Sequence, residues 1–587
     1  MRLSLPHPAH AMRGWVALGV VLLLMLLPAD AFAQDTDADI PSVTRTFALE
    51  NVRIVQAPGR VIEQGTLLVR DGLIAAVGTN VEIPFDAERI TGDSLTVYAG
   101  FIDGLSNTGL PKPKEEENQP RVDDPGNPPN DRAGIQPERD VRTMIDPGQK
   151  SIKDLRAAGF GAAHIVPHGR MLPGTGSVIL LSGDAPDAMV IQGEVSLFAQ
   201  FEGARGMYPA TPMAMTAKMR QLYREADRRH RIEAMYADNP SGMERPVYDA
   251  VHYAFFPVLE GTQPVFFYVD SALELHRALK LKADLGFPLI LGGLNESFNM
   301  IDDLQAANVP LFFSLQLPKQ PKEMAKLKED SIDVLIASYD PEFRTGTFRD
   351  LEAEKRNLEA RQLMTRRMYL ENAAKLHEAG LAFGFMTMGV KAGDIHKNLR
   401  TMIARGLPED AALAALTTTP ADLLGLSQRL GTIDVGKIAN LVVTTAPYFE
   451  EDAKIRYVFV DGVKYAYEVK EKKKPSGEGA EDGPINPTGS WTFSVATPGG
   501  EIGGNFSLNG SPDDLSGTLS LDMAPGNFEL VDIELDGNSL FFAFDFPDAG
   551  GRITFDLTLI GEEIEGMATA PGQGDAPVSG SRESGPE

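Results

Sequence analysis

The amino-acid sequence predicts an α/β protein: a TIM-like (β/α)8 barrel, a β-sandwich built from the segments before and after it, and a C-terminal antiparallel all-β domain. Three observations carry this prediction. Between residues 99 and 430, short apolar runs alternate with amphipathic helical patterns. Strand patterns with hairpin dipeptides flank this region on both sides. After residue 488, apolar and polar residues alternate as they do in antiparallel strands.

The composition limits the classes of function. The chain has 587 residues, of which 43% are hydrophobic and 23% charged, so it can form packed cores and is not a disordered protein. It carries 55 Lys and Arg against 82 Asp and Glu, and a net charge of −27 argues against nucleic acid as a partner. The absence of cysteine excludes disulfides, thiolate nucleophiles and zinc–thiolate sites. Any metal would therefore have to be held by the nine histidines and the carboxylates.

Residues 1–33 have the pattern of a cleavable secretory signal peptide. A weakly basic start is followed by the apolar run Trp15–Leu27 and by the small-residue motif Ala31-Phe32-Ala33. The run is short for a transmembrane helix, and no later segment is long and apolar enough to span a membrane. We therefore expect a periplasmic or secreted protein with no membrane span after cleavage, in which seven of the nine histidines remain.

Residues 34–98 are expected to form the first part of the β-sandwich. The predicted strands are Thr46–Val55, Gly65–Arg70 and Leu73–Val77. Asp71-Gly72 between the last two is a hairpin turn signal. Residues 431–467 return to strand chemistry with a second such turn at Asp461-Gly462, so we expect the two segments to share a sheet.

The barrel prediction over residues 99–430 depends on repeated strand and helix patterns. The expected strands are Gly161–Val166, Pro264–Tyr268, Pro288–Leu291, Val309–Leu315, Val334–Ala337 and Ala382–Phe385, and the clearest helices are Ser271–Leu285, Leu351–Ala379 and Asp410–Leu416. Residues 111–148 are rich in Pro, Gly and charge and are predicted to be a long loop insertion on the surface. The glycine-rich stretch Gly174–Ser177 is interpreted as a tight turn.

The C-terminal part begins after a predicted linker, residues 468–487, which is rich in Lys, Gly and Pro. Residues 490–587 contain seventeen acidic residues and two arginines, a net charge of −15. The alternation of Ile553, Phe555, Leu557 and Leu559 with polar residues predicts an antiparallel barrel or sandwich over 488–587. Asp532, Glu534 and Asp536 are interpreted as carboxylates on the wet side of a strand rather than as a calcium site.

Three stretches carry a resemblance to a known family. They are Val97–Asp103, Pro264–Glu296 and Gly406–Val443, the last containing Gly431-Thr432-Ile433-Asp434-Val435-Gly436-Lys437. Together they resemble the amidohydrolase superfamily, in particular its secreted imidazolonepropionase-like branch, over about residues 46–467. The resemblance implies a barrel whose C-terminal rim binds one or two divalent metals, usually zinc. It also implies hydrolysis of C–N bonds other than peptide bonds.

The sequence departs from the family at the implied metal ligands. The His-x-His pair after the first strand, the histidines of the fifth and sixth strands and the aspartate of the eighth correspond here to Leu105 and Asn107, Tyr268, Asn295 or Glu296, and Met386 or Met388. Leucine cannot bind a metal, and methionine does not replace a carboxylate. The substitutions therefore predict that the metal site has been lost and that no metal cofactor is bound.

Other residues offer weaker candidates for chemistry. His164 and His168 flank the end of a predicted strand, but alternate strand residues share a face and the two imidazoles need not converge. Asp103, Asp270 and Glu296 could meet at the barrel mouth and perform metal-free acid–base work.

Two functions remain open. The first is a degenerate member that binds a small-molecule ligand or pairs with a paralogue or a second copy. The second is an active amidohydrolase with an atypical metal site, for which zinc would be the cofactor.

Overall fold

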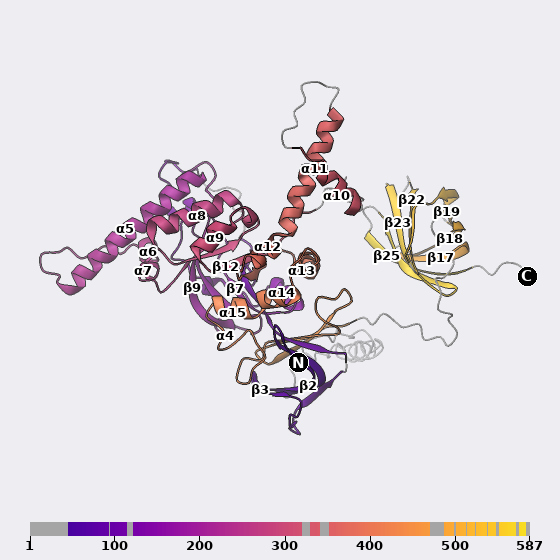
Figure 1. Ribbon diagram of the computed structural model, residues 1–587, viewed down its shortest axis with the longest axis horizontal. Coiled ribbons are helices and arrows are strands. Elements are labelled where there is room, and N and C mark those ends of the chain that lie inside the picture. Colours follow the sequence, from indigo (N-terminus) through magenta and orange to yellow (C-terminus); the bar gives the residue numbers. More distant parts are fainter. Residues whose placement is uncertain are drawn as a thin grey trace, which may run out of the picture. The chain divides into compact units, whose positions relative to one another are not determined.

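The computed structural model describes residues 45–582 except for 93, 114–120, 320–328, 341–350, 470–486, 498–499, 512–513, 523, 537, 547–550 and 571–573. The chain divides into two compact units, Met1–Val469 and Lys470–Glu587, which are considered separately (Figure 1). The predicted signal peptide lies outside the described residues, as does almost all of the predicted linker.

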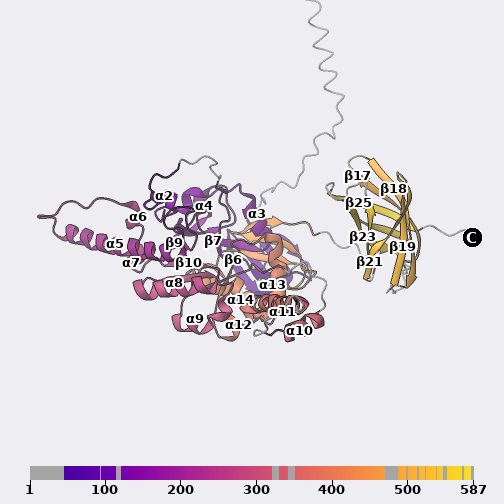
Figure 2. The same ribbon diagram turned by 90° about the horizontal axis from the view of Figure 1, so that it is seen from above.

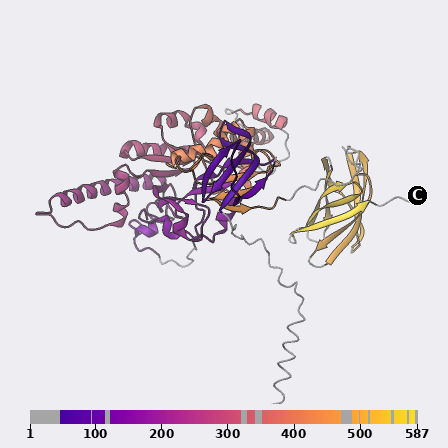
Figure 3. The ribbon, with the colours of Figure 1, turned by 90° about the horizontal axis from the view of Figure 1, so that it is seen from below.

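Strands from both ends of the first unit form one eight-stranded sheet. The strands are β1 (Thr46–Ala57), β2 (Arg60–Arg70), β3 (Leu73–Gly78), β4 (Glu88–Thr91), β5 (Thr96–Ala99), β14 (Leu441–Thr444), β15 (Ile455–Val460) and β16 (Val463–Ala466). Their order is β16-β15-β14-β5-β1-β2-β3, with β4 paired to β1. The early segment joins the late one through the antiparallel pair β5 and β14, visible as indigo and orange strands in Figure 3.

This sheet curls so that its two predicted hairpin turns meet. Asp71 and Gly72 have φ values of 51° and 81°, and Asp461 and Gly462 have 54° and 73°, the left-handed conformation that such tight turns require. A Cβ on Gly462 would lie 2.6 Å from the Cα of Gly72, so glycine is needed where the turns touch. The resulting apolar core includes Phe47, whose ring contacts that of Phe459 at 5.4 Å.

A second eight-stranded sheet forms the barrel. Its strands are β6 (Phe101–Ser106), β7 (Phe160–Ile165), β8 (Gly174–Leu180), β9 (Val190–Gln200), β10 (Val265–Val269), β11 (Leu289–Gly293), β12 (Leu311–Ser314) and β13 (Gly384–Met386), hydrogen-bonded in sequence order. The first and last strands approach each other, and the Met388 amide donates to the Leu105 carbonyl at 3.0 Å. The barrel is therefore nearly closed.

The barrel is mixed rather than fully parallel, which corrects the predicted (β/α)8 arrangement. Strand β8 runs antiparallel to both β7 and β9. The connection from β7 to β8 spans only residues 166–173, and the next holds only the short helix α4 (Pro186–Met189). A parallel crossover needs about a dozen residues or more, so the chain reverses instead. The interpretation of Gly174–Ser177 as a tight turn was also wrong, because these residues form the first part of strand β8.

Helices pack on the outside of the barrel sheet (Figures 1 and 2). They include α3 (Lys150–Ala157), α8 (Ala272–Leu285), α9 (Ile301–Ala307), α12 (Asn372–Glu378), α13 (Ile395–Ala404), α14 (Glu409–Leu416) and α15 (Thr418–Leu423). Helix α11 (Leu351–Leu370) instead extends away from the barrel beyond α12 (Figure 1). Helix α8 begins as predicted, with the Ser271 hydroxyl accepting from the Glu274 amide, and ends at Gly286 in the left-handed conformation.

The predicted strand Val334–Ala337 is wrong, because these residues end helix α10 (Glu329–Ala337). Ile332, Leu335 and Ile336 follow helical spacing and pack with Leu363 of α11. The predicted helix Leu351–Ala379 is interrupted at Glu371, which separates α11 from α12. None of the described helices combines the length and the apolar character that a membrane crossing requires.

The insertion 111–148 and helix α5 are two further features of the first unit. The insertion 111–148 is not wholly a surface loop, since Ile135 and Val141 are fully buried in the core between barrel and helices. It contains the short helical turns α2 (Asn130–Ala133) and η2 (Val141–Met144). Helix α5 (Pro212–Asp238) projects from the barrel as a long arm (Figure 2).

The second unit is an antiparallel β domain, as predicted. Its nine strands are β17 (Gly489–Thr497), β18 (Gly500–Ser511), β19 (Asp514–Leu521), β20 (Ala524–Glu529), β21 (Val531–Asp536), β22 (Ser539–Phe546), β23 (Gly551–Ile560), β24 (Glu563–Ala570) and β25 (Gly574–Arg582), in the order β20-β19-β18-β17-β25-β24-β23-β22-β21. Phe555, Leu557 and Leu559 face the aromatic core. The Asp532 carboxylate forms an ion pair with Arg552 at 2.7 Å, which agrees with a surface role for this residue.

Candidate functional site

Four of the residues that the family resemblance places at metal-ligand positions belong to, or pack against, an apolar cluster inside the barrel. Leu105 and Met386 are fully buried in one hydrophobic cluster, and Tyr268 and Met388 pack against it. Phe266 and Phe312 stack in the same cluster with ring centroids 5.5 Å apart. The Met386 sulfur accepts a hydrogen bond from the Gly293 amide at 3.0 Å. Apolar side chains therefore pack together inside the barrel, and four of the predicted pocket residues are among them.

His164 lies inside the barrel on β7 with both ring nitrogens engaged. Its Nδ1 lies 2.9 Å from the Gly104 carbonyl, which can only accept, so Nδ1 carries the hydrogen. Its Nε2 then accepts from the Ser196 hydroxyl of β9 at 3.1 Å. Burial lowers the pKa of His164 to about 4, although the bond to Gly104 opposes the shift. The imidazole is therefore neutral at pH 7.

The space around the His164–Ser196 pair is closed by β8. A Cβ on Gly176 would lie 2.5 Å from His164 Nε2 and 3.0 Å from the Ser196 hydroxyl. Both side chains are fully buried. This arrangement has the hydrogen-bond pattern of a nucleophile and its base, but no substrate atom can approach the serine. The pair therefore contributes to packing and polarity inside the barrel.

Asp103 of β6 closes the seam of the barrel. Its carboxylate accepts from the Thr387 amide at 2.8 Å, the Thr387 hydroxyl at 2.6 Å and the Leu105 amide at 3.3 Å. Burial raises the pKa of Asp103 to about 6, and the hydrogen bonds from Thr387, Ser106 and Leu105 oppose this rise. These bonds link β6 to the residue that follows β13. The role of Asp103 is therefore to stabilise the closure of the barrel, and its carboxylate does not face a ligand.

The other two candidate carboxylates lie together at the rim, apart from Asp103. Asp270 follows β10 and accepts a hydrogen bond from Asn295. Glu296 follows β11 and uses both oxygens: one accepts from the Ala272 amide at 2.9 Å and the other from the Tyr369 hydroxyl at 2.6 Å. Burial, the bond to Glu296 and the charge of Asp270 raise the pKa of Tyr369.

Tyr268 at the end of β10 belongs to the same rim. Burial raises its pKa, and the nearby charges of Asp270 and Glu274 add to the rise. Its hydroxyl is therefore protonated at physiological pH. Asp270 and Glu274 also belong to the N-terminal cap of α8, where Glu274 accepts from the Asp270 amide at 2.9 Å.

The remaining predicted residues do not assemble a metal site. Asn107 donates to the Val166 carbonyl at 2.7 Å. His168 does not join His164: it is half-buried in the loop after β7, and burial together with Arg139 and Lys112 lowers its pKa. Within the described part of the chain, no three His, Cys, Asp or Glu side chains gather as a metal would require.

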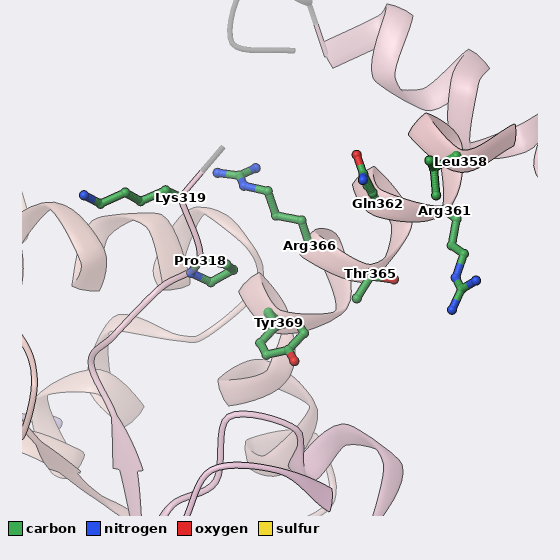
Figure 4. Close-up of a pocket in the computed structure, with 8 residues that line it drawn as sticks. All are labelled: Pro318, Lys319, Leu358, Arg361, Gln362, Thr365, Arg366 and Tyr369. Atoms are coloured by element: carbon green, nitrogen blue, oxygen red, sulfur yellow. The ribbon is translucent and has the colours of Figure 1, made fainter. Parts of the chain in front are cut away.

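A pocket of about 630 Å³ opens next to this rim (Figure 4). Its lining comes from Pro318 and Lys319, which follow β12, and from one face of helix α11 that ends at Tyr369. Tyr369 therefore contributes its ring to the pocket while its hydroxyl binds Glu296.

Three residues that complete these contacts were not anticipated from the sequence. Ser196 lies 32 residues from His164, Tyr369 lies 73 residues from Glu296, and Thr387 lies 284 residues from Asp103. Serine, tyrosine and threonine are common residue types, and each of these three lies in a stretch whose sequence looks like any other strand or helix. No local signal in the sequence marks them.

Comparison with known proteins supports the family resemblance. Residues 319–464 match the model of the amidohydrolase family. Amidohydrolase tasK of Hapsidospora irregularis is 47% identical over 57 residues, which are 10% of this chain and only 6% of that protein.

One solved structure agrees at the level of the fold. The amidohydrolase from Thermotoga maritima aligns with 72% of this chain and all of its own, at 20% identity and a TM-score of 0.56. A Xaa-Pro dipeptidase with bound methionine covers the same shares at 14% identity and a TM-score of 0.39. Residues 319–464 thus resemble the amidohydrolase family, and the first unit shares the fold of the Thermotoga maritima amidohydrolase.

Proposed function

We propose that this protein is a degenerate amidohydrolase whose barrel no longer binds a catalytic metal, and that it binds a small-molecule ligand at the barrel rim instead of in the packed interior. The observation that carries the proposal is the apolar packing inside the barrel. Leu105 and Met386 are fully buried where the family resemblance implies metal ligands, and Phe266 and Phe312 pack beside them. Leucine and phenylalanine side chains supply no ligand atoms for a hard divalent ion.

The nearest donor atoms also argue against a relocated metal. The Nε2 of His164 accepts from Ser196, and the backbone of Gly176 passes too close to leave room for an ion. Asp103 accepts three hydrogen bonds from Thr387 and Leu105. Because the ligands of a metal must offer uncommitted lone pairs, these residues do not fit a zinc centre.

The proposal also includes the branch of the family, the export of the protein and its partner. The motifs between Gly406 and Val443 favour the imidazolonepropionase-like branch of the superfamily. The pattern of residues 1–33 favours export to the periplasm or the outside. A second copy or a metal-bearing paralogue is the partner that a degenerate member of such a family would be expected to have.

Hydrolysis assays test the proposal. The full chain would be incubated with ZnCl₂, dialysed, and assayed on hydantoins, cyclic imides and N-acyl amino acids. We expect no turnover above the buffer rate. Chelator-sensitive turnover that falls in Glu296→Gln but not in Glu565→Gln, an exposed carboxylate of the second unit, would overturn the proposal in favour of an active enzyme with an atypical site.

A further inference from the structure

The outer end of helix α5 (Pro212–Asp238) projects beyond the part of the helix that packs on the first unit (Figure 2). The buried side chains of this helix all lie before residue 227; they are Met215, Met219, Leu222, Tyr223 and Ala226. In the outer turns, Met235 is 60% exposed. Helices in proteins gain most of their stability from packing one face against a neighbour. A helix that continues for about three turns beyond its own core therefore favours a further partner for those turns.

Helix α5 and the segment that follows it carry no net charge, unlike the chain as a whole. Residues 212–260 include α5, α6 (Ala250–Tyr253) and α7 (Phe256–Leu259), and they contain seven Lys and Arg and seven Asp and Glu. The whole chain carries −27, so two copies repel each other over much of their surface. A projecting segment without net charge therefore favours a second copy as the partner.

One face of the outer turns of α5 carries a stripe of four exposed side chains. Their spacings of three, four and three residues place them on the same side of a helix: Arg228, Arg231, Met235 and Asp238. The segment after α5 contacts other positions of the helix, because Arg229 donates to the Val247 carbonyl and Glu233 accepts from the Tyr253 hydroxyl. The stripe therefore stays exposed.

The stripe is self-complementary when two copies of it run antiparallel. Arg228 and Asp238 form no ion pair within the described part of the chain, whereas Arg231 already pairs with Asp227 at 2.5 Å. A two-fold axis beside residue 233 brings Arg228 of each copy to Asp238 of the partner subunit, since both lie five residues from the axis. The same axis brings Met235 to the aliphatic part of the partner's Arg231. A symmetric interface requires a self-complementary surface of this kind.

We propose that the outer end of α5 binds the same segment of a second copy, in an antiparallel contact with two Arg228–Asp238 ion pairs and Met235 between them. The contact uses about three turns of one helix from each copy, so the dimer is weak and sensitive to salt. It supplies the partner that the proposed function includes and rests on that function in this respect only. The loss of the metal does not enter it.

Sedimentation equilibrium of the full chain between about 2 and 200 μM, in low and high salt, tests the contact. We expect a monomer–dimer equilibrium whose dissociation constant rises with salt. Arg228→Asp and Asp238→Arg should each weaken the dimer at least about tenfold, because each change replaces two attractions by two repulsions. An equimolar mixture of the two variants should dimerise again, since each variant supplies the charge that the other lacks. The matched control is Lys397→Asp, an exposed position on α13, which changes the net charge equally and should change the affinity less than about twofold.

Three results would overturn the inference. They are a monomer at all concentrations, a dimer that both substitutions leave intact, and a mixture of the two variants that stays monomeric. Circular dichroism at 222 nm checks that both variants keep their helices, which is expected because the two positions are exposed. The association is measured independently of metal content and hydrolytic activity, so failure of this contact and failure of the proposed function are distinguishable.

Discussion

Two buried ionisable groups of the barrel, Asp103 and His164, should make stability depend on pH in opposite directions. Asp103 has a folded pKa of about 6 against an ordinary value of 3.8, so its favourable contribution is complete below pH 3.8 and is lost as the pH rises through 6. His164 has a folded pKa of about 4 against 6.5, so its contribution is present above pH 6.5 and is lost as the pH falls through 4.

The expected magnitudes are similar. One pKa unit corresponds to about 1.4 kcal/mol, so each group changes the free energy of unfolding by about 3 kcal/mol across its window. Between pH 4 and 6 the two contributions oppose each other in the wild type. In Asp103→Asn, the His164 contribution remains, and stability should rise with pH relative to the wild type. In His164→Gln, stability should fall with pH over the same range.

Urea unfolding between pH 4 and 7, followed by circular dichroism at 222 nm, measures this difference. All helices in the described residues belong to the first unit, so this signal follows the barrel. Tryptophan fluorescence would not, because Trp491 lies in the second unit. His276→Gln, an exposed position on α8, is the control and should follow the wild type. Parallel pH profiles for Asp103→Asn, His164→Gln and the wild type would refute the reasoning.

Two further substitutions test the packing of the site. Gly176→Ala should lower the free energy of unfolding by about 1–3 kcal/mol, because its Cβ would meet His164, whereas Gly393→Ala, with open space around it, should change it by less than about 0.5 kcal/mol. Urea midpoints measure both, and equal effects would contradict the close contact. Tyr369→Phe should cost about 1–3 kcal/mol, since it removes a hydrogen bond to the Glu296 carboxylate. An unchanged midpoint would show that this bond does not hold α11 to the rim.

Local features of the fold could be predicted because their causes are local. The hairpin at Asp71-Gly72 follows from residues that adopt positive φ, and helix α8 follows from a serine cap and a terminal glycine. The alternation along β23 likewise marked its buried face. The prediction of a strand at Val334–Ala337 was wrong because a short apolar run fits a strand or a buried helix equally well, and its packing against Leu363 places it in a helix.

The direction of β8 and the partners in the site could not be predicted in this way. The chain reverses after β7 because the connection to β8 is short. This connection could not be measured from the sequence, since the start of β8 lies in a glycine-rich stretch that does not have a strand pattern. The bond between Asp103 and Thr387 joins the first and last barrel strands, so it exists only once the barrel closes. The candidate residues Leu105 and Met386 were recognised through the family resemblance, and the structure adds that they are buried in one apolar cluster.

The metal content of the purified protein tests the central claim most directly. Full-length protein would be purified without chelators or metal-affinity resin and analysed by inductively coupled plasma mass spectrometry, with an intact zinc amidohydrolase as reference. We expect less than about 0.1 zinc, iron or manganese ion per chain, because the ring nitrogens of His164 and the carboxylate of Asp103 are already engaged in hydrogen bonds inside the barrel. About one ion per chain, lost on substitution of Asp103, His164, Asp270 or Glu296, would contradict it.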